Sequence, residues 1–376
     1  MITTQDVLKA LSTCQEPELR KDIVSLGMVR NVEISGPRVS FDYVLTTPAC
    51  PLKGMMEEEA RAAVLKIPGV TEVAIRMTGQ VRKDPRLEGV LPPGIKNVVA
   101  VGSGKGGVGK STVAANLAVG LALDGASVGL MDADIYGPNQ PQMLGVPGWK
   151  LGPAEDERIA PAESHGIKLM SMGFLMEPDK AAIWRGPMLH GAITQFLKDV
   201  RWGDLDYLIV DLPPGTGDVQ LSLCQSVPLA GAVVVTTPQS VATADVVRAV
   251  AMFGKLQVPV LGVVENMAAF ACPHCGKESR IFSSGGAENL AQKYGVPLLG
   301  SVPLDPQICD SGEKGKPVIL SHPDSRPSRS FRDLARKVAA RVSVLGASAK
   351  KGNREGAMRQ DASQASGSGH AVARAE

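Results

Sequence analysis

A glycine-rich stretch between residues 102 and 112 constrains the fold of this chain more than any other feature. Gly104 to Ser111 read GKGGVGKS and match the pattern G-x-x-x-x-G-K-[S/T], with an apolar run of strand length before them and a helical pattern after them. Glycines let successive backbone N–H groups turn towards phosphate oxygens, Lys110 neutralises their charge, and Ser111 is a ligand type for Mg²⁺. A glycine-rich turn that binds no ligand is a weaker interpretation than a phosphate-binding loop, because strand, loop and helix occur in the order that such a loop requires. The predicted phosphate loop comprises Gly104, Lys105, Gly106, Gly107, Val108, Gly109, Lys110, Ser111 and Thr112.

Short apolar runs recur beyond this loop, and helical patterns separate them. One helical pattern places Val113, Leu117 and Leu121 four residues apart and stops at Gly125. The expected strands lie at residues 97–101, 127–131, 207–210, 232–236, 260–264 and 298–302. Alternation of strands with helices is typical of a parallel sheet covered by helices on both faces. The sequence therefore predicts an α/β fold, a doubly wound, mostly parallel sheet of the P-loop NTPase type.

The chain is long enough for more than one domain, and its patterning divides it. Residues 1–78 show the patterns of helix, two strands, helix and strand, which predict a small α+β domain. Residues 79–96 are rich in Pro, Gly and charge without apolar periodicity, as expected of a linker. The larger domain spans 97–345 and ends in a helix at 330–345 that has an apolar side and basic residues elsewhere. Residues 346–376 are small, polar and aperiodic, so we expect a disordered tail.

Carboxylates and an amide follow the predicted strands, at the sheet edge where ligands bind in open α/β folds. Asp132 and Asp134 come directly after one strand, so one of them can orient a water molecule. Asp211 ends another strand and opens a loop containing Gly215, which predicts a metal-side carboxylate and a loop that senses the γ-phosphate. A helix N-cap is the alternative role for Asp211. Asn266 follows a further strand and either reads an adenine base or belongs to a turn.

Composition limits the location and partners of the protein. Six cysteines in 376 residues are too few for a disulfide scaffold, and in a reducing compartment they fit core thiols or metal ligands. The N-terminus lacks a basic start followed by an apolar run, so no secretory signal is expected. The longest uncharged stretch, 219–244, contains Pro228, Pro238 and several polar residues, which argues against a membrane span. A net charge of +2 argues against a strongly basic surface that binds nucleic acid. We therefore expect a cytoplasmic protein with neither nucleic-acid nor membrane partners.

Cys272 and Cys275 form a C-x-x-C pair after a predicted strand. Zinc and iron–sulfur clusters take four such ligands, and no second C-x-x-C pair occurs in the sequence. A two-fold dimer in which each chain supplies one pair completes the set. A cluster or a zinc ion at such a dimer site, a redox dithiol and an inert loop pair are all compatible with the spacing.

The phosphate loop resembles the deviant Walker A motif of the MinD/ParA/nitrogenase iron protein class. In that class an extra lysine, Lys105 here, reaches the nucleotide of the partner subunit, which implies a homodimer and a role like that of an arginine finger. Further motifs in the same order make residues 97 to about 320 resemble the Mrp/ApbC family of iron–sulfur cluster carrier ATPases. These motifs are MDADIYGP from Met131, DLPPGTGD from Asp211, and VENM from Val264 followed by CPHC from Cys272.

The resemblance implies an activity and its ligands. The implied cofactors are ATP, Mg²⁺ and a 4Fe-4S cluster shared across the dimer, and the implied partners are apo iron–sulfur proteins and cluster assembly scaffolds. Slow ATP hydrolysis is implied to use Lys105, Lys110 and Asp134, with Asp134 positioning the attacking water and Asp132 in the outer shell of the metal. The implied nucleotide-binding set is the phosphate loop with Asp132, Asp211, Gly215 and Asn266.

The cysteines take their roles from the same resemblance. Cys272 and Cys275 are implied to hold the cluster. The first domain resembles the small FeS-assembly domain that precedes this ATPase in many bacterial members, through the motifs EPEL from Glu16, DIVSLG from Asp22 and TTPACP from Thr46. Cys50 in the last motif precedes a predicted helix, whose dipole can lower the pKa of the thiol and make it a transient ligand. An ordinary cysteine at a helix start is the alternative.

Two other functions use parts of the same pattern. A spatial-organising ATPase of the MinD or ParA type would bind membrane or DNA, with the helix at 330–345 as a basic amphipathic anchor. It leaves Cys272 and Cys275 unexplained. A zinc-clasped nucleotide switch would use the two cysteines without any cluster chemistry.

Overall fold

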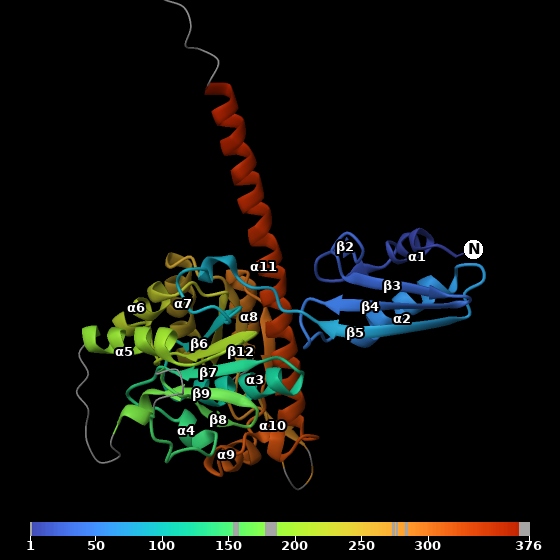
Figure 1. The fold of residues 1–376 in the computed structure, drawn as a ribbon. Helices are drawn as coiled ribbons and strands as arrows, with labels where there is room; N and C mark the ends of the chain where they lie inside the picture. The colour runs from blue at the N-terminus through green and yellow to red at the C-terminus, as the bar shows by residue number, and fades with distance from the viewer. Residues whose placement is uncertain are drawn as a thin grey trace, which may run out of the picture.

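The computed structural model describes residues 2–152, 158–176, 186–272, 275, 277–282 and 285–367. A small N-terminal unit, blue in Figure 1, lies beside a larger unit built around one sheet. No helix in the described part of the chain is long and apolar enough to cross a membrane.

The larger unit is organised by an eight-stranded sheet in the order β15-β12-β11-β6-β10-β7-β9-β8. Every neighbouring pair is parallel except β8 and β9. The strands are β6 (Val98–Ser103), β7 (Val128–Asp132), β8 (Ala162–Ser164), β9 (Ile167–Ser171), β10 (Tyr207–Asp211), β11 (Gly231–Thr236), β12 (Val260–Glu265) and β15 (Leu298–Ser301). The predicted fold class, a doubly wound and mostly parallel α/β sheet, is confirmed.

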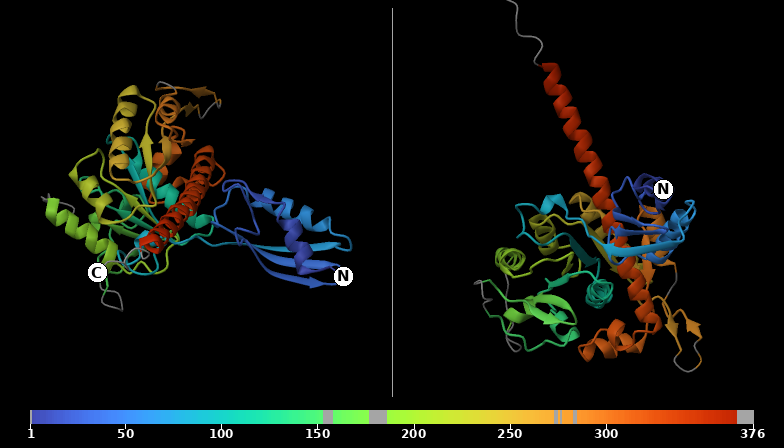
Figure 2. Two further views of the ribbon diagram at one scale, coloured as in Figure 1. Left: turned by 90° about the horizontal axis from the view of Figure 1, so that it is seen from above. Right: turned by 45° about the vertical axis from the view of Figure 1, so that its right-hand side comes forward.

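Helices cover both faces of this sheet because successive strand residues point to opposite faces and both sets are apolar. Val99 and Val101 belong to the core that includes α3 (Lys110–Leu123), whereas Val98 and Ala100 belong to the core on the other face. Figures 1 and 2 show α3 and α11 on one side and α5, α6 and α7 on the other. The remaining helices are α4 (Gln140–Met143), α5 (Gly186–Asp199), α6 (Asp218–Ser226), α7 (Ser240–Lys255), α8 (Gly286–Tyr294), α9 (Pro306–Glu313), α10 (Val318–Ser321) and α11 (Arg326–Gly367), with η2 at Met172–Leu175.

The antiparallel hairpin β8–β9 at the sheet edge is absent from the sequence prediction. Its two-residue turn is His165-Gly166, and both residues have positive φ, 51° and 77°. Such turns suit the twist of a hairpin. The signal for this hairpin is a single glycine after a histidine, which is weaker than the Asn-Gly or Asp-Gly pairs that normally mark these turns.

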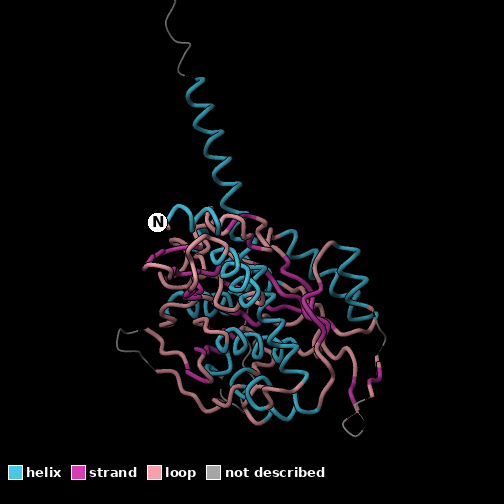
Figure 3. The backbone as a smooth tube through the Cα atoms, turned by 90° about the vertical axis from the view of Figure 1, so that its right-hand side faces the viewer, coloured by secondary structure: helices cyan, strands magenta, loops and turns pink. Residues whose placement is uncertain are grey.

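α11 is longer than predicted. Its apolar side chains Phe331, Leu334, Val338 and Val342 are buried in the core that contains α3, so they do not form a membrane-binding surface. The structure continues α11 to Gly367, as Figure 3 shows, where the sequence analysis expects a disordered tail from residue 346; the disorder of that tail stays a prediction. A helix already formed extends without a new nucleus, and the Ala, Lys, Arg and Gln of this segment favour helix without any apolar stripe. The expectation for 368–376 lies outside the described residues.

The N-terminal unit has a three-stranded sheet in the order β3-β4-β5, with β3 antiparallel and β5 parallel to the central strand. Alternate residues of β4, such as Phe41 and Tyr43, are buried with Val7 and Leu11 of α1 and Met56 of α2. Its elements are α1 (Thr4–Leu11), β1 (Gln15–Glu16), β2 (Lys21–Asp22), β3 (Val29–Ser35), β4 (Arg38–Leu45), α2 (Lys53–Leu65) and β5 (Glu72–Gly79).

The two units touch through the loop at 46–51. The hydroxyl of Tyr207, at the start of β10, donates to Thr47 Oγ1 at 3.1 Å in a buried contact, and Ala49 packs into the core of the larger unit. The connecting segment 79–96 contains η1 (Pro85–Leu87) and buries Leu87 and Ile95 in the larger unit. The segment predicted as a linker is therefore packed along the domain that follows it.

Candidate nucleotide site

The phosphate loop leaves the sheet at its centre, because β6 lies between β11 and β10. Gly107 and Gly109 have φ of 79° and 81°, which favour glycine, and Gly109 is the N-cap of α3. A Cβ on Gly104 would lie 2.4 Å from the backbone of Asp245, so no larger residue fits there. The loop thus presents its backbone and the start of a 14-residue helix to one point, an arrangement suited to an anion.

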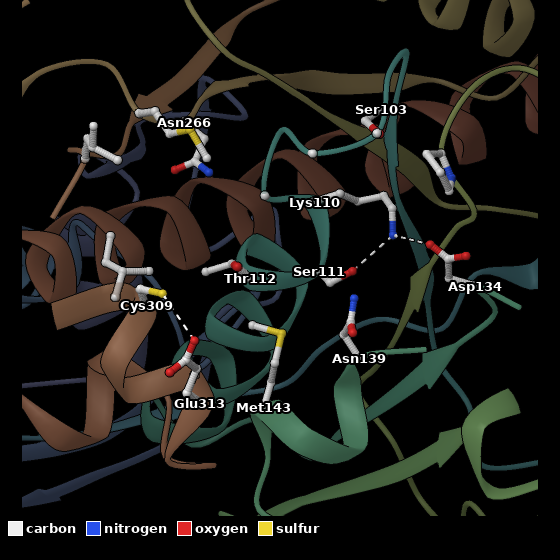
Figure 4. Close-up of a pocket in the computed structure, with 18 of the residues that line it drawn as sticks. Ser103, Lys110, Ser111, Thr112, Asp134, Asn139, Met143, Asn266, Cys309 and Glu313 are labelled. Atoms are coloured by element: carbon white, nitrogen blue, oxygen red, sulfur yellow. Dashed lines mark hydrogen bonds and ion pairs between the residues drawn. The ribbon is translucent and has the colours of Figure 1, made fainter. Parts of the chain in front are cut away.

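Lys110 brings the predicted carboxylates together. Its side chain is 6 % exposed, and its Nζ lies 2.6 Å from Asp211 Oδ1 and 3.6 Å from Asp134 Oδ2. It also donates to Ser111 Oγ at 3.2 Å, as Figure 4 shows. The sheet order explains this cluster, since β10 pairs with both β6 and β7 and places Asp211 opposite Asp132.

Asp132 and Asp134 occupy different environments. Asp132 is fully buried and accepts hydrogen bonds from Ser171 Oγ at 2.9 Å and from the backbone N–H of Asp134 at 3.2 Å. Burial and the neighbouring Asp211 raise the pKa of Asp132 to about 8. Burial also raises the pKa of Asp134, and Lys110 opposes this shift. Asp134 lines the cavity beside the phosphate loop, whereas Asp132 anchors the loop that follows β7 from inside the protein.

Asp211 is not a helix N-cap. It is the last residue of β10, and the next helix, α6, has Gly217 as its N-cap. The loop between them is attached to β6 by a hydrogen bond from the backbone N–H of Gly215 to the carbonyl oxygen of Ser103, at 3.0 Å. Gly215 has a φ of 95°, which explains a glycine at this point.

Asn266 supports the phosphate loop from the side. Its side chain is buried, and Nδ2 donates to the carbonyl oxygen of Val108 at 2.9 Å. Its backbone N–H donates to Thr236 at the end of β11. The cavity beside it measures about 490 Å³, within the usual range for small-molecule sites. Its lining includes Met143 at the end of α4, Leu304 in the loop before α9, and residues of α9 itself.

Lys105 and Thr112 lie at the outer parts of the loop. Lys105 is exposed, and its backbone carbonyl accepts from Ser103 Oγ at 2.9 Å. Both Lys105 and Thr112 line the cavity. The Lys105 side chain is therefore positioned by an anchored backbone and remains open to solvent.

The cysteine pair lies on a short antiparallel hairpin formed by β13 (Phe270–Ala271) and β14 (Glu278–Ser279). Cys272 is half-buried and its backbone N–H donates to Lys277, while Cys275 is exposed. Pro273, His274 and Gly276 lie outside the described residues. Within the described parts of the chain, no group of three or more His, Cys, Asp or Glu residues could hold a metal ion.

The expectation that Cys50 has a lowered thiol pKa is wrong. Burial raises the pKa of this half-buried thiol, and the backbone hydrogen bond from Leu52 opposes the shift only partly. The helix α2 starts at Lys53, so Cys50 lies before its first turn, and the dipole effect falls off quickly with distance.

Two residues of the site are absent from the sequence analysis. Ser171 at the end of β9 donates to Asp132, and Gln140 at the start of α4 donates to Asp211. β9 itself was not predicted, which hides Ser171. Gln140 lies two positions after the MDADIYGP motif. A glutamine in a sequence does not indicate which distant residue its amide will hydrogen-bond to.

Comparison with known proteins assigns this constellation to a family. Residues 94–339 match the NUBPL iron-transfer P-loop NTPase family, and residues 4–75 match the iron–sulfur cluster assembly protein family. The chain belongs to the NUBPL iron-transfer P-loop NTPase family. The resemblance inferred from the motifs is thereby confirmed, and the carrier interpretation is supported over a spatial-organising ATPase.

Relatives and solved structures agree with the family. The iron–sulfur cluster carrier protein of Deinococcus radiodurans is 53% identical over 340 residues, covering 90% of this chain and 95% of that protein. A nucleotide-binding protein of Archaeoglobus fulgidus in complex with ADP is 39% identical, with a TM-score of 0.56 over 65% of this chain and 94% of that one. The cell division ATPase MinD of Pyrococcus furiosus is 26% identical, with a TM-score of 0.50 over 64% of this chain and 98% of that one.

Proposed function

We propose that the chain is a homodimeric, slow ATPase that carries a 4Fe-4S cluster from cluster assembly scaffolds to apo iron–sulfur proteins. The observation that carries the proposal is the position of Asn266. Its side chain holds the phosphate loop at Val108, and the same segment continues within six residues to Cys272 on the hairpin. A conformational change of the phosphate loop can therefore be transmitted to the cysteine pair through one hydrogen bond and a short segment of chain.

The oxygen ligands beside the phosphate loop fit Mg²⁺. Ser111 offers a hydroxyl and Asp211 a carboxylate, which are hard donors of the kind this ion prefers. Magnesium, when bound, neutralises phosphate charge.

The side chains of the site then have distinct tasks. Lys110 leaves Asp211 and pairs with phosphate oxygens, because a phosphate carries more charge than one carboxylate. Asp134, on the cavity wall, orients the attacking water. Lys105 is exposed and reaches the nucleotide of the partner subunit, where it stabilises charge in the transition state.

The cysteine pair handles the cargo. Cys272 and Cys275 of one chain supply two thiolates, and a two-fold axis supplies the other two, which together satisfy a 4Fe-4S cluster. An exposed hairpin allows a cluster to be accepted from one protein and passed to another. We place the protein in the cytoplasm, where thiols stay reduced, and assign it no nucleic-acid or membrane partner.

Anaerobic reconstitution tests this proposal. The purified full chain is incubated with iron and sulfide, and iron and sulfide per dimer are measured with the visible spectrum for wild type, Cys272→Ala and Cys275→Ala. We expect about four irons per wild-type dimer and a loss of both iron and absorbance in the variants, with ADP binding retained. Cys224→Ala, which changes a buried cysteine of the core, is the matched control and should keep the cluster.

The result that opposes the proposal is equally definite. Retention of about four irons by Cys272→Ala would remove the bridging role of the pair. One zinc and no iron per wild-type dimer would favour the zinc clasp instead.

A further inference from the structure

Gln140 lies where three segments of the nucleotide site meet. It is the first residue of α4, at the end of the loop that begins with Asp132, and its side chain is completely buried. A buried amide is costly unless it is hydrogen-bonded, so its partners define what it does.

The Gln140 amide joins the phosphate loop to the end of β10. Nε2 donates to the carbonyl oxygen of Ser111 at 2.9 Å and to Asp211 Oδ2 at 2.9 Å. The backbone N–H of Gln140 donates to Asp132 Oδ2 at 3.3 Å. One residue therefore connects the start of α3, the carboxylate at the end of β10 and the carboxylate at the end of β7.

The orientation of the amide is fixed by its neighbours. Ser111 O and Asp211 Oδ2 are both acceptors, so only the NH₂ group can face them. The opposite atom, Oε1, is buried and has no hydrogen-bond partner in the described part of the chain. Turning the amide over would bring three acceptors together and is excluded.

Asp211 divides its two oxygens between two partners. Oδ1 lies 2.6 Å from Lys110 Nζ, and Oδ2 receives the Gln140 amide. When Lys110 turns to a phosphate, the first contact is lost and the second is kept. Without Gln140, the Asp211 carboxylate would then keep no hydrogen bond to another side chain in the described part of the chain, in a buried site beside Asp132.

We propose that Gln140 is a positioning residue, which holds the Asp211 carboxylate against the phosphate loop so that the magnesium side of the nucleotide site keeps its geometry. The inference rests on the proposed function, because it assumes that ADP and ATP bind here with Mg²⁺. It adds a residue outside the sequence motifs that predict the site.

The test compares Gln140 with a glutamine that lies away from the nucleotide cavity. Gln140→Met keeps the length of the side chain but removes both hydrogen bonds of the amide. Gln292→Met is the matched control, because Gln292 is exposed on α8 and is not part of the cavity lining. Calorimetry of the full chain measures ADP binding without Mg²⁺ and then over a series of Mg²⁺ concentrations.

The expected difference is selective. In Gln140→Met the affinity for ADP without Mg²⁺ stays within about twofold of wild type, while the Mg²⁺ concentration for half-maximal enhancement rises roughly tenfold, the scale of one hydrogen bond to a charged group. Gln292→Met should match wild type in both measurements. An unchanged Mg²⁺ dependence in Gln140→Met overturns the inference.

A second variant separates positioning from packing and serves if the first fails to fold. Gln140→Asn keeps an amide but is one methylene too short for Asp211. Positioning predicts a raised Mg²⁺ requirement in both variants, whereas packing alone predicts a wild-type Mg²⁺ requirement in both and a lower melting temperature for Asn. A wild-type protein that binds no ADP with Mg²⁺ would overturn the proposed function itself, whereas a normal wild type with normal variants overturns only the role of Gln140.

Discussion

Relative to wild type, the Asp132→Asn variant should gain stability as the pH rises. Burial and the Asp211 carboxylate raise the pKa of Asp132 to about 8 in the folded chain, against 3.8 for the ordinary carboxyl. Between these values, unfolding releases a proton, so the unfolding free energy falls as the pH rises towards 8 and the loss is complete above it. Asn is a neutral mimic of the protonated acid and avoids that loss. Its single oxygen accepts on one side only, and its NH₂ group faces the donors on the other side, at a cost that does not depend on pH.

The expected loss of unfolding free energy in the wild type depends on the pH interval that is compared. Each pH unit between the two pKa values costs up to about 1.4 kcal/mol, so an interval from about pH 6 to about pH 7.5 costs up to ~2 kcal/mol. Water that enters around the ionised carboxylate lowers this bound, and we expect about 1 kcal/mol. For a domain of this size that corresponds to roughly 2 to 4 °C in Tm.

Thermal unfolding followed by circular dichroism measures this at both pH values and constant ionic strength. The Tm of Asp132→Asn minus that of wild type should be larger at the higher pH by that amount. Asp199→Asn, at an exposed position near the end of α5, controls for the loss of one carboxyl group. A difference for Asp132→Asn that is equal at both pH values, or larger at the lower one, would refute a buried protonated carboxyl.

Three further predictions concern the phosphate loop and the domain contact. Lys110→Ala should weaken ADP binding by about 10- to 100-fold in calorimetry, because the phosphates lose a charge-assisted partner; unchanged affinity contradicts the assignment. Lys105→Ala should fold normally but lower kcat by about 10³-fold. Mixing it with Lys110→Ala should restore part of the activity, because a mixed dimer has one site with Lys110 from one chain and Lys105 from the other. Failure to restore activity argues against action across the dimer. A double-mutant cycle with Tyr207→Phe and Thr47→Val in urea should give a coupling of about 1 kcal/mol; additivity would mean that the two units do not meet there in solution.

The central sheet could be predicted because its strands are buried on both faces and therefore form continuous apolar runs. β9 was not predicted because Lys168 interrupts its apolar run and its partner β8 has only one buried residue, so neither strand gives a strong pattern. The helix beyond residue 345 was not predicted because its sequence has helix-forming residues but no apolar periodicity, and the prediction relied on periodicity.

The sequence by itself determined the phosphate loop, the sheet class and the chemistry offered by Lys110, Asp134, Asp211 and the cysteine pair. These follow from local rules, because a glycine loop between strand and helix and a carboxylate at a strand end need no knowledge of distant residues. Only the tertiary structure decided that Gln140 bonds to Asp211, because that contact joins positions 71 residues apart and depends on the order of strands in the sheet. Strand order is set by packing over the whole core. It also buries Asp132 more deeply than Asp134, and the two carboxyl groups therefore have different environments.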